Sequence, residues 1–252
     1  MFGFGKQKIN ADEISADMQK LIDALGCPYE YFPKGSSPDK VINAYEDAFA
    51  KCEMGGFTPV IVTSDYIQRN LVNTDIDKLK EQKEILLKTR EFNAQNWFTN
   101  KLTEWKNELG TNWNETVGEV VCEKEDTSKN FSGFIDFSNS KSKECILAKI
   151  PTNEPWEVFA SLPFGGWNEC PNQDEILWIS KYWYECCKAV PAVVSSDILE
   201  FSVPPVKDKE AALGVALEHF AFCSDIVFQG FDTIGRLAGK LMQSTVWYFW
   251  WD

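Results

Sequence analysis

A regular alternation of amphipathic helical stretches with short runs of apolar, β-branched residues constrains the fold of this chain more than any other feature. Residues 10–26 and 37–56 have the apolar spacing and the closing glycines of helices, and strand-like runs follow them at residues 27–32 and 57–64. The same order returns later, where a helical stretch over residues 172–187 precedes two strand-like runs. We therefore expect an α/β or α+β fold in which helices cover a mixed β-sheet.

Two of the strand-like runs repeat the same order of residue types. The segments TPVIVTSDYI (residues 58–67) and VPAVVSSDIL (residues 190–199) share a proline, apolar residues, a valine, a hydroxyl residue, a serine and an aspartate. Strand and turn chemistry that converged twice would explain the likeness. A duplication that placed two helix–strand units side by side in one sheet would explain it as well.

A helical pattern extends from Thr74 to Gly110, which is longer than most globular helices. An unbroken helix of that length would reach roughly 50 Å at 1.5 Å per residue, so we expect it to be bent or to link two lobes. Polar turns and strand-like runs alternate in the stretch that follows. These patterns predict an N-terminal α/β region over residues 1–110, a β-meander or connector over residues 111–150 and a C-terminal α/β domain over residues 151–252.

The last nine residues, STVWYFWWD, are strongly aromatic. Strand alternation places Trp247, Phe249 and Trp251 on one face and Tyr248 and Trp250 on the other. Burial of one aromatic side chain removes about 150–250 Å² from water, so exposure of all of them would be unfavourable. Because both faces are aromatic, the pattern predicts a central core strand with layers on both sides.

The charge balance restricts the type of partner. Asp and Glu number 38 against 25 Lys and Arg, which gives a formal net charge of -13, and the basic residues form no run. Nucleic-acid binding needs a clustered basic face, so we expect no nucleic-acid partner and no anionic membrane surface. A basic protein partner is favoured instead, since complementary charge steers association. The sequence has neither a signal peptide nor a run of ~20 apolar residues, which indicates a cytoplasmic protein.

The eight cysteines are expected to be free thiols, because they are spread through helical and strand-like stretches. Cys186 and Cys187 are adjacent, and His219 and Cys223 have a spacing found among metal ligands. However, the chain has no CxxC pair and no second histidine, so we predict no metal site. A glycine-rich phosphate loop is also missing, and we predict no cofactor.

Three separated motifs of the C-terminal part carry a resemblance to a known family. They are LPFGGWNECP (residues 162–171), LEFSVPPVKDKEAALGVALEHFAFCSDIVFQG (residues 199–230) and WYFWWD (residues 247–252). In this order, over roughly residues 156–252, they resemble the domain of unknown function family 4253 (DUF4253). The resemblance implies a bacterial cytoplasmic protein without an established activity, and it supplies no catalytic residues. A toxin-neutralising immunity role is one suggestion for such proteins.

The first candidate site is the loop GGWNEC within the first motif, called the GGWNEC loop below. Its two glycines allow unusual backbone angles and a proline stiffens either end, so the loop could present Trp167, Asn168, Glu169 and Cys170 to a ligand. The structural alternative is a rigid turn whose tryptophan packs into the core while a polar residue caps the next helix.

The second candidate site is the segment of residues 218–229. His219 is the only histidine, so any imidazole chemistry must use it. Cys223, or Cys170 brought near by folding, could be a nucleophile with His219 as its base. The structural alternative is a buried histidine beside an apolar helix. The remaining polar candidates of this segment are Glu218, Asp225 and Gln229.

Asp252 places a carboxylate after the aromatic strand. It could be solvated, pair with Arg236, or form an acidic spot beside Trp167 or Glu169 that recognises a basic group. We predict a non-catalytic binding module that uses the GGWNEC loop, the 218–229 segment and Asp252, and that binds a basic protein as immunity proteins do. The alternatives are an enzyme with a cysteine nucleophile and His219, or a small-molecule sensor with an aromatic pocket. A monomer and a homodimer are both open.

Overall fold

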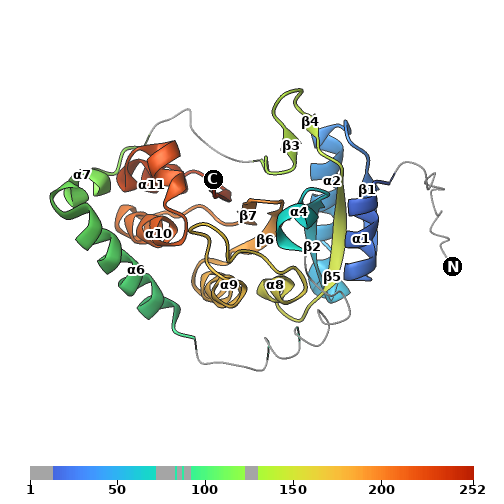
Figure 1. Ribbon diagram of the computed structural model, residues 1–252, viewed down its shortest axis with the longest axis horizontal. Coiled ribbons are helices and arrows are strands. Elements are labelled where there is room, and N and C mark those ends of the chain that lie inside the picture. Colours follow the sequence, from blue (N-terminus) through green and yellow to red (C-terminus); the bar gives the residue numbers. More distant parts are fainter. Residues whose placement is uncertain (1–13, 72–82, 84–86, 88–91, 123–129) are drawn as a thin grey trace.

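The alternation of helical and strand-like stretches builds one six-stranded mixed β-sheet with helices packed against it, so the predicted α/β fold class is confirmed (Figure 1). The computed structural model describes residues 14–71, 83, 87, 92–122 and 130–252. The sheet has the strand order β1-β5-β2-β6-β7-β8, and a separate hairpin of β3 and β4 projects from the molecule. Among the described residues, no helix combines the length and the apolar character needed to cross a membrane.

The N-terminal part forms where the sequence predicts helices and strands. The first helix begins after Ser15, whose hydroxyl accepts a hydrogen bond from the Met18 N–H, and it ends at Gly26 in the left-handed conformation. The elements are α1 (Ala16–Leu25), β1 (Tyr29–Phe32), α2 (Pro38–Phe49), α3 (Cys52–Gly55), β2 (Phe57–Thr63) and α4 (Tyr66–Asn70).

The middle of the chain departs from the predicted continuous helical pattern at Asn93. The helical pattern that starts at Thr74 is not one unbroken helix, because Asn93 has an extended backbone and its side chain caps a new helix by accepting from the Asn96 N–H. The residues from 74 to 91, apart from 83 and 87, lie outside the described part. The elements are α6 (Ala94–Leu109), η2 (Gly110–Asn112), α7 (Trp113–Val117), β3 (Ile135–Asp136), β4 (Lys141–Ser142) and β5 (Cys145–Pro151).

The strand β5 belongs to the main sheet, where it pairs with β1 on one side and β2 on the other. The sheet thus continues across the predicted boundaries at residues 110 and 150, and those boundaries stay a prediction. The C-terminal elements are η3 (Pro155–Glu157), α8 (Val158–Ser161), α9 (Gln173–Cys187), β6 (Val190–Val194), β7 (Ile198–Ser202), α10 (Lys209–Phe222), η4 (Val227–Phe231), α11 (Ile234–Leu241) and β8 (Val246–Trp250).

The sheet consists of two antiparallel halves that meet at one parallel strand pair. The strands β1, β5 and β2 pair antiparallel, and so do β6, β7 and β8. Between the halves, β2 and β6 pair in parallel, with Ile61 opposite Val193 and Val62 opposite Val194. We call this pair the β2–β6 seam.

The seam is formed by the two segments that echo each other in sequence. Equivalent positions of the two segments face each other across it, in agreement with the duplication hypothesis. The preceding helices nevertheless cover opposite faces, because α2 packs in the hydrophobic cluster of Ile61 and Val193 whereas α9 packs in that of Val62 and Val194. The likeness therefore extends to the strands and their turns but not to the helices.

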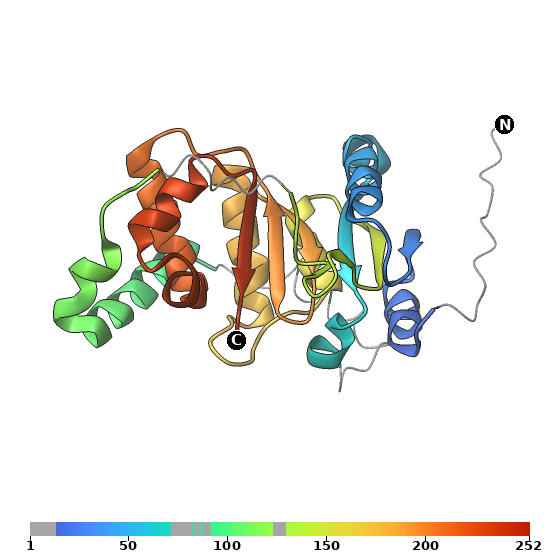
Figure 2. The same cartoon turned by 90° about the horizontal axis from the view of Figure 1, so that it is seen from above.

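The aromatic strand β8 lies at an edge of the sheet, so the prediction of a central strand is wrong. It pairs with β7, and in Figure 2 the dark red strand lies between β7 and the helices α10 and α11. Trp247, Phe249 and Trp251 are fully buried against the helical face, as alternation predicts. Tyr248 and Trp250 are only half-buried on the opposite face.

A buried carboxylate holds that segment on the sheet. Glu200 of β7 is 1% exposed and lies on the face opposite to α9 and α10. It accepts hydrogen bonds from the N–H groups of Ser132 (2.9 Å) and Gly133 (3.0 Å) and from the Ser132 hydroxyl (3.0 Å). Phe131 and Phe134 on either side pack into the core. Glu200 therefore links the irregular segment 131–134 to the sheet.

Candidate functional site

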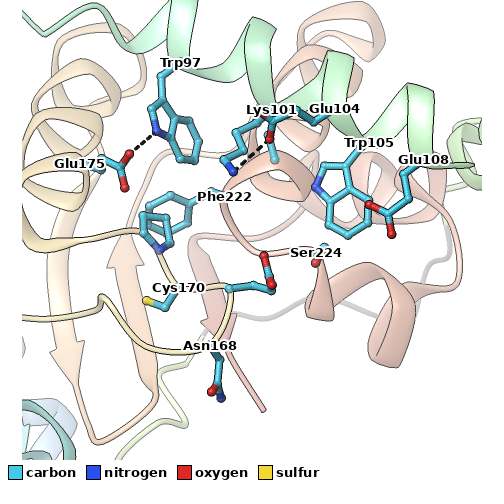
Figure 3. Close-up of a pocket in the computed structure, with 13 residues that line it drawn as sticks. Trp97, Lys101, Glu104, Trp105, Glu108, Asn168, Cys170, Glu175, Phe222 and Ser224 are labelled. Carbon is cyan, nitrogen blue, oxygen red and sulfur yellow. Dashed lines mark hydrogen bonds and ion pairs between the residues drawn. The ribbon is translucent and has the colours of Figure 1, made fainter.

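A cavity of about 380 Å³ lies where α6 passes over the GGWNEC loop and the end of α10 (Figure 3). The side chains of Trp97, Lys101 and Trp105 extend from α6 toward the loop. The cavity therefore combines a helix from the middle of the chain with both candidate segments of the C-terminal part. Its lining residues are Trp97, Lys101, Glu104, Trp105, Glu108, Asn168, Glu169, Cys170, Pro171, Glu175, Ala221, Phe222 and Ser224.

The GGWNEC loop is a rigid turn with one position open to glycine alone. Gly165 has φ +90°, and a Cβ atom there would lie 2.0 Å from the carbonyl oxygen of Pro171. The loop closes through a hydrogen bond from the Gly166 N–H to that same oxygen at 3.0 Å. This closure leaves Asn168 and Glu169 exposed at the rim of the cavity and buries Cys170 beneath them.

Trp167 fastens the loop to the N-terminal half and does not line the cavity. Its indole N–H donates to the side-chain oxygen of Asn70 at 3.2 Å, and the guanidinium of Arg69 lies 4.4 Å from the ring centre. Its ring also packs against Phe164 and Trp251. The structure thus gives Trp167 the packing role of the structural alternative.

Four of the candidate residues come together in one hydrogen-bonded chain. The side-chain amide of Asn168 donates to the main-chain carbonyl of Asp252. The N–H of Asp252 donates to the carboxylate of Asp225 at 3.1 Å, and Gln229 donates to the other oxygen of that carboxylate at 3.2 Å. Arg236 forms an ion pair with Asp232 at 3.0 Å. Three separate segments thus build an acidic rim beside the cavity.

Glu218 lies away from the cavity, between α9 and α10. Its two carboxylate oxygens accept hydrogen bonds from the Tyr182 hydroxyl and the Trp183 indole N–H, both at 2.8 Å. Burial raises the pKa of its carboxyl above the usual range. Glu218 therefore positions α9 against α10, and no contact brings it to the residues of the GGWNEC loop.

The cysteine–histidine candidates are buried in an apolar environment. His219 packs 4.5 Å from the ring centre of Trp247 and 4.6 Å from that of Phe249, and burial lowers its pKa to about 3. Cys223 donates its thiol hydrogen to the carbonyl of Trp250 at 3.0 Å, and burial raises its pKa to about 12. Burial also raises the pKa of Cys170. This environment disfavours the thiolate and imidazolium forms that nucleophilic catalysis requires.

The contribution of α6 is the part of the site that the sequence interpretation missed. Lys101 lies one helical turn after Trp97 and Trp105 lies one turn further, so the three share a face. Glu104 and Glu108 are also one turn apart and form a neighbouring row. This spacing was visible in the sequence as part of an amphipathic pattern. The spacing does not indicate which surface the helix covers, so it does not identify these residues as part of a site.

The electrostatic character of the cavity is acidic. Four of its lining residues carry carboxylates, Lys101 is the only cation among them, and Lys101 is paired with Glu104 at 3.1 Å. Glu175 is engaged as well, since it accepts from the Trp97 indole N–H at 2.8 Å and closes the capping box of α9 with Asn172. Carboxylates beside indole rings can bind a cationic group, because both attract positive charge. In the part of the chain that the structure describes, no three His, Cys, Asp or Glu side chains are placed to hold a metal ion.

These features define an α/β protein with a mixed sheet and an acidic cavity walled by indole rings. Residues 146–252 match the family model described as Domain of unknown function (DUF4253), which confirms the resemblance over the C-terminal part of the chain. No curated protein and no solved structure matches the chain. The match includes the GGWNEC loop and α10 but not α6, so one wall of the cavity lies outside the matched residues.

Proposed function

We propose that the protein is a non-catalytic binding module that takes a basic group of a protein partner into the cavity between α6 and the GGWNEC loop. The observation that supports this proposal is the lining itself. Two indole rings and four carboxylates surround about 380 Å³, and the single lining cation is paired with Glu104. An entering guanidinium or ammonium group would meet carboxylate acceptors and indole rings beside the paired Lys101.

The physical chemistry of such a site favours arginine or lysine side chains. A guanidinium group can donate to carboxylates and also stack on an aromatic face, and a cation over an indole gains about 0.5–2 kcal/mol. The net charge of -13 would steer a basic partner toward the protein over a longer range. An immunity protein that blocks a basic toxin is the specific form of this proposal.

The experiment uses short fluorescent peptides with central arginine residues, with matched peptides in which glutamine replaces arginine. Fluorescence anisotropy should show binding of the arginine peptides only, with an affinity that falls as salt rises. The double variant Glu108→Gln, Glu169→Gln should weaken binding about tenfold, since exposed ion pairs contribute about 0.2–1 kcal/mol each.

The matched control is the double variant Glu115→Gln, Glu119→Gln, which removes the same charge from exposed positions outside the cavity. It should bind the arginine peptides nearly as well as the wild-type protein does. Equal losses of affinity in both double variants would show that net charge alone causes the binding, and this result would contradict a role of the cavity. If the glutamine peptides bound as tightly as the arginine peptides, the proposal of a basic partner would be contradicted.

A small cationic molecule is the second candidate ligand, because a cavity of about 380 Å³ falls within the ~300–1,000 Å³ range of small-molecule sites. Native mass spectrometry of freshly purified protein separates the two candidates. An extra mass that disappears on denaturation would favour the sensor alternative. A bare chain that binds arginine peptides would favour the protein partner.

A further inference from the structure

Two adjacent cysteines at the end of α9 lie outside the proposed binding site. Cys186 is exposed and Cys187 is half-buried, and neither lines the cavity beneath α6. Their sulfur atoms are 3.1 Å apart. Two thiols at this separation, with one of them open to solvent, form a pair that can act on the same ligand atom.

The two cysteines are the last two residues of α9. Neighbouring residues in a helix point about 100° apart, so adjacent side chains do not normally face each other. Here Cys187 is the last helical residue, and Lys188 turns into the left-handed conformation with φ 57°. The last turn closes with the Lys188 N–H directed to the carbonyls of Trp183 and Tyr184. The two thiols nevertheless lie 3.1 Å apart at this helix end, with the Cys186 side chain exposed.

The two sulfurs also differ in chemical character. The hydrogen bond between the two thiols is the main cause that lowers the pKa of Cys186. The same interaction raises the pKa of Cys187. The thiolate form is therefore favoured more at Cys186 than at Cys187, and the 3.1 Å separation keeps both sulfurs within reach of one centre.

We propose that Cys186 and Cys187 form a dithiol site that binds a trivalent organoarsenical or a similarly thiophilic metalloid across both sulfurs. With phenylarsine oxide, two arsenic–sulfur bonds form and the arsenic–oxygen bond breaks. The two thiol hydrogens leave with that oxygen as water, so arsenic stays trivalent and no electron is transferred.

The geometry favours such a bridge over a disulfide and over zinc. Consecutive Cα atoms lie about 3.8 Å apart across a trans peptide, below the ~4.4 Å lower limit found for disulfides, so a direct bond would distort the helix end. A bridging atom only needs both sulfurs on one side of it, and 3.1 Å provides that arrangement. Structural zinc takes four protein ligands, whereas this site offers two sulfurs.

The experiment incubates the reduced full-length protein with phenylarsine oxide and removes excess reagent in the presence of a monothiol. Native mass spectrometry should show one phenylarsenic group retained per chain, and maleimide should then find two thiols fewer. Ethanedithiol should release the group, because it supplies the same chelation. Peptide mapping should locate the protected thiols at Cys186 and Cys187.

The variants Cys186→Ser and Cys187→Ser should each lose retention, since chelation by two linked groups raises affinity about 10²–10⁴-fold over one. The matched control is Cys122→Ser, which removes a single exposed thiol and should leave retention unchanged. Equal retention in all four proteins, or none in the wild-type protein, would overturn the proposal. Mapping that places the arsenic on other cysteines would overturn it as well. Should a serine variant not fold, the wild-type mapping decides.

Discussion

The replacement Glu200→Gln should change the way in which stability depends on pH. Glu200 is fully buried on β7, and burial raises the pKa of its carboxyl from 4.5 to about 7, although its hydrogen bonds from Ser132 and Gly133 lower it in part. The folded protein therefore binds this proton more tightly than the unfolded chain does. Glutamine has nearly the same shape but cannot ionise.

The sign and the size of the effect follow from this difference. Because the folded pKa is raised, the stabilisation by the protonated carboxyl is complete below the unfolded pKa of 4.5 and is lost as the pH rises through about 7. At ~1.4 kcal/mol per pH unit, the loss over this window is about 3 kcal/mol. The glutamine amide also leaves one buried N–H group of the 131–134 segment without an acceptor, which costs about 1–3 kcal/mol at every pH.

The assay is urea unfolding of the wild-type protein and the variant at several pH values between 4.5 and 8. The quantity of interest is the wild-type free energy of unfolding minus that of the variant, because other titrating groups cancel in it. The wild-type free energy of unfolding minus that of Glu200→Gln should fall by about 3 kcal/mol as the pH rises from 4.5 to 7. The exposed Glu30 of β1 supplies the control, since Glu30→Gln removes a carboxylate without removing a buried one. A difference that is constant over this pH range would refute the reasoning.

Three further predictions concern the core and the GGWNEC loop. Burial lowers the pKa of His219 to about 3, so the stabilisation by the neutral imidazole is complete above pH 6.5 and is lost as the pH falls toward 3. In urea unfolding, the free energy of unfolding of His219→Gln should therefore decrease less over this pH range than that of the wild-type protein. Gly165→Ala should destabilise the protein by more than 1 kcal/mol, because the added Cβ would lie 2.0 Å from the Pro171 carbonyl oxygen. The same variant should bind arginine peptides more weakly although its charge is unchanged. Unchanged stability would contradict the closed conformation of the loop. Asn70→Ala removes the acceptor of the Trp167 indole and the donor to the Ser196 carbonyl at 3.1 Å, so we expect a loss of about 1–3 kcal/mol in urea unfolding, and a loss below 0.5 kcal/mol would contradict that role.

Local signals in the sequence identified features that depend on neighbouring residues. The start of α9 is an example, because Asn172 accepts from the Glu175 N–H while the Glu175 side chain accepts from the Asn172 N–H. Alternation along β8 likewise groups Trp247 and Phe249 on one face, and the structure buries that face. Such features are fixed within a few residues, so a single sequence can reveal them.

The features that the sequence did not reveal depend on contacts between distant segments. The edge position of β8 is determined by which strands find partners, and its own residues match a central strand equally well. The packing of Trp167 depends on Arg69 and Asn70, which lie almost a hundred residues earlier. The cavity was only half visible, because the spacing of Trp97 and Trp105 indicates a helix face without indicating what the face covers.

The β2–β6 seam has a mechanical consequence. Its ladder holds two residue pairs, whereas β2 and β5 share seven, so tension across the sheet concentrates at the seam. Side chains of α4 reinforce it, since Tyr66 donates to the Pro163 carbonyl at 2.6 Å and Asn70 donates to that of Ser196. Partial unfolding should therefore separate the two three-stranded halves as units. Because Arg69 and Asn70 hold Trp167 of the GGWNEC loop, a partner that pulls on the N-terminal half would release this wall of the cavity as the sheet parts.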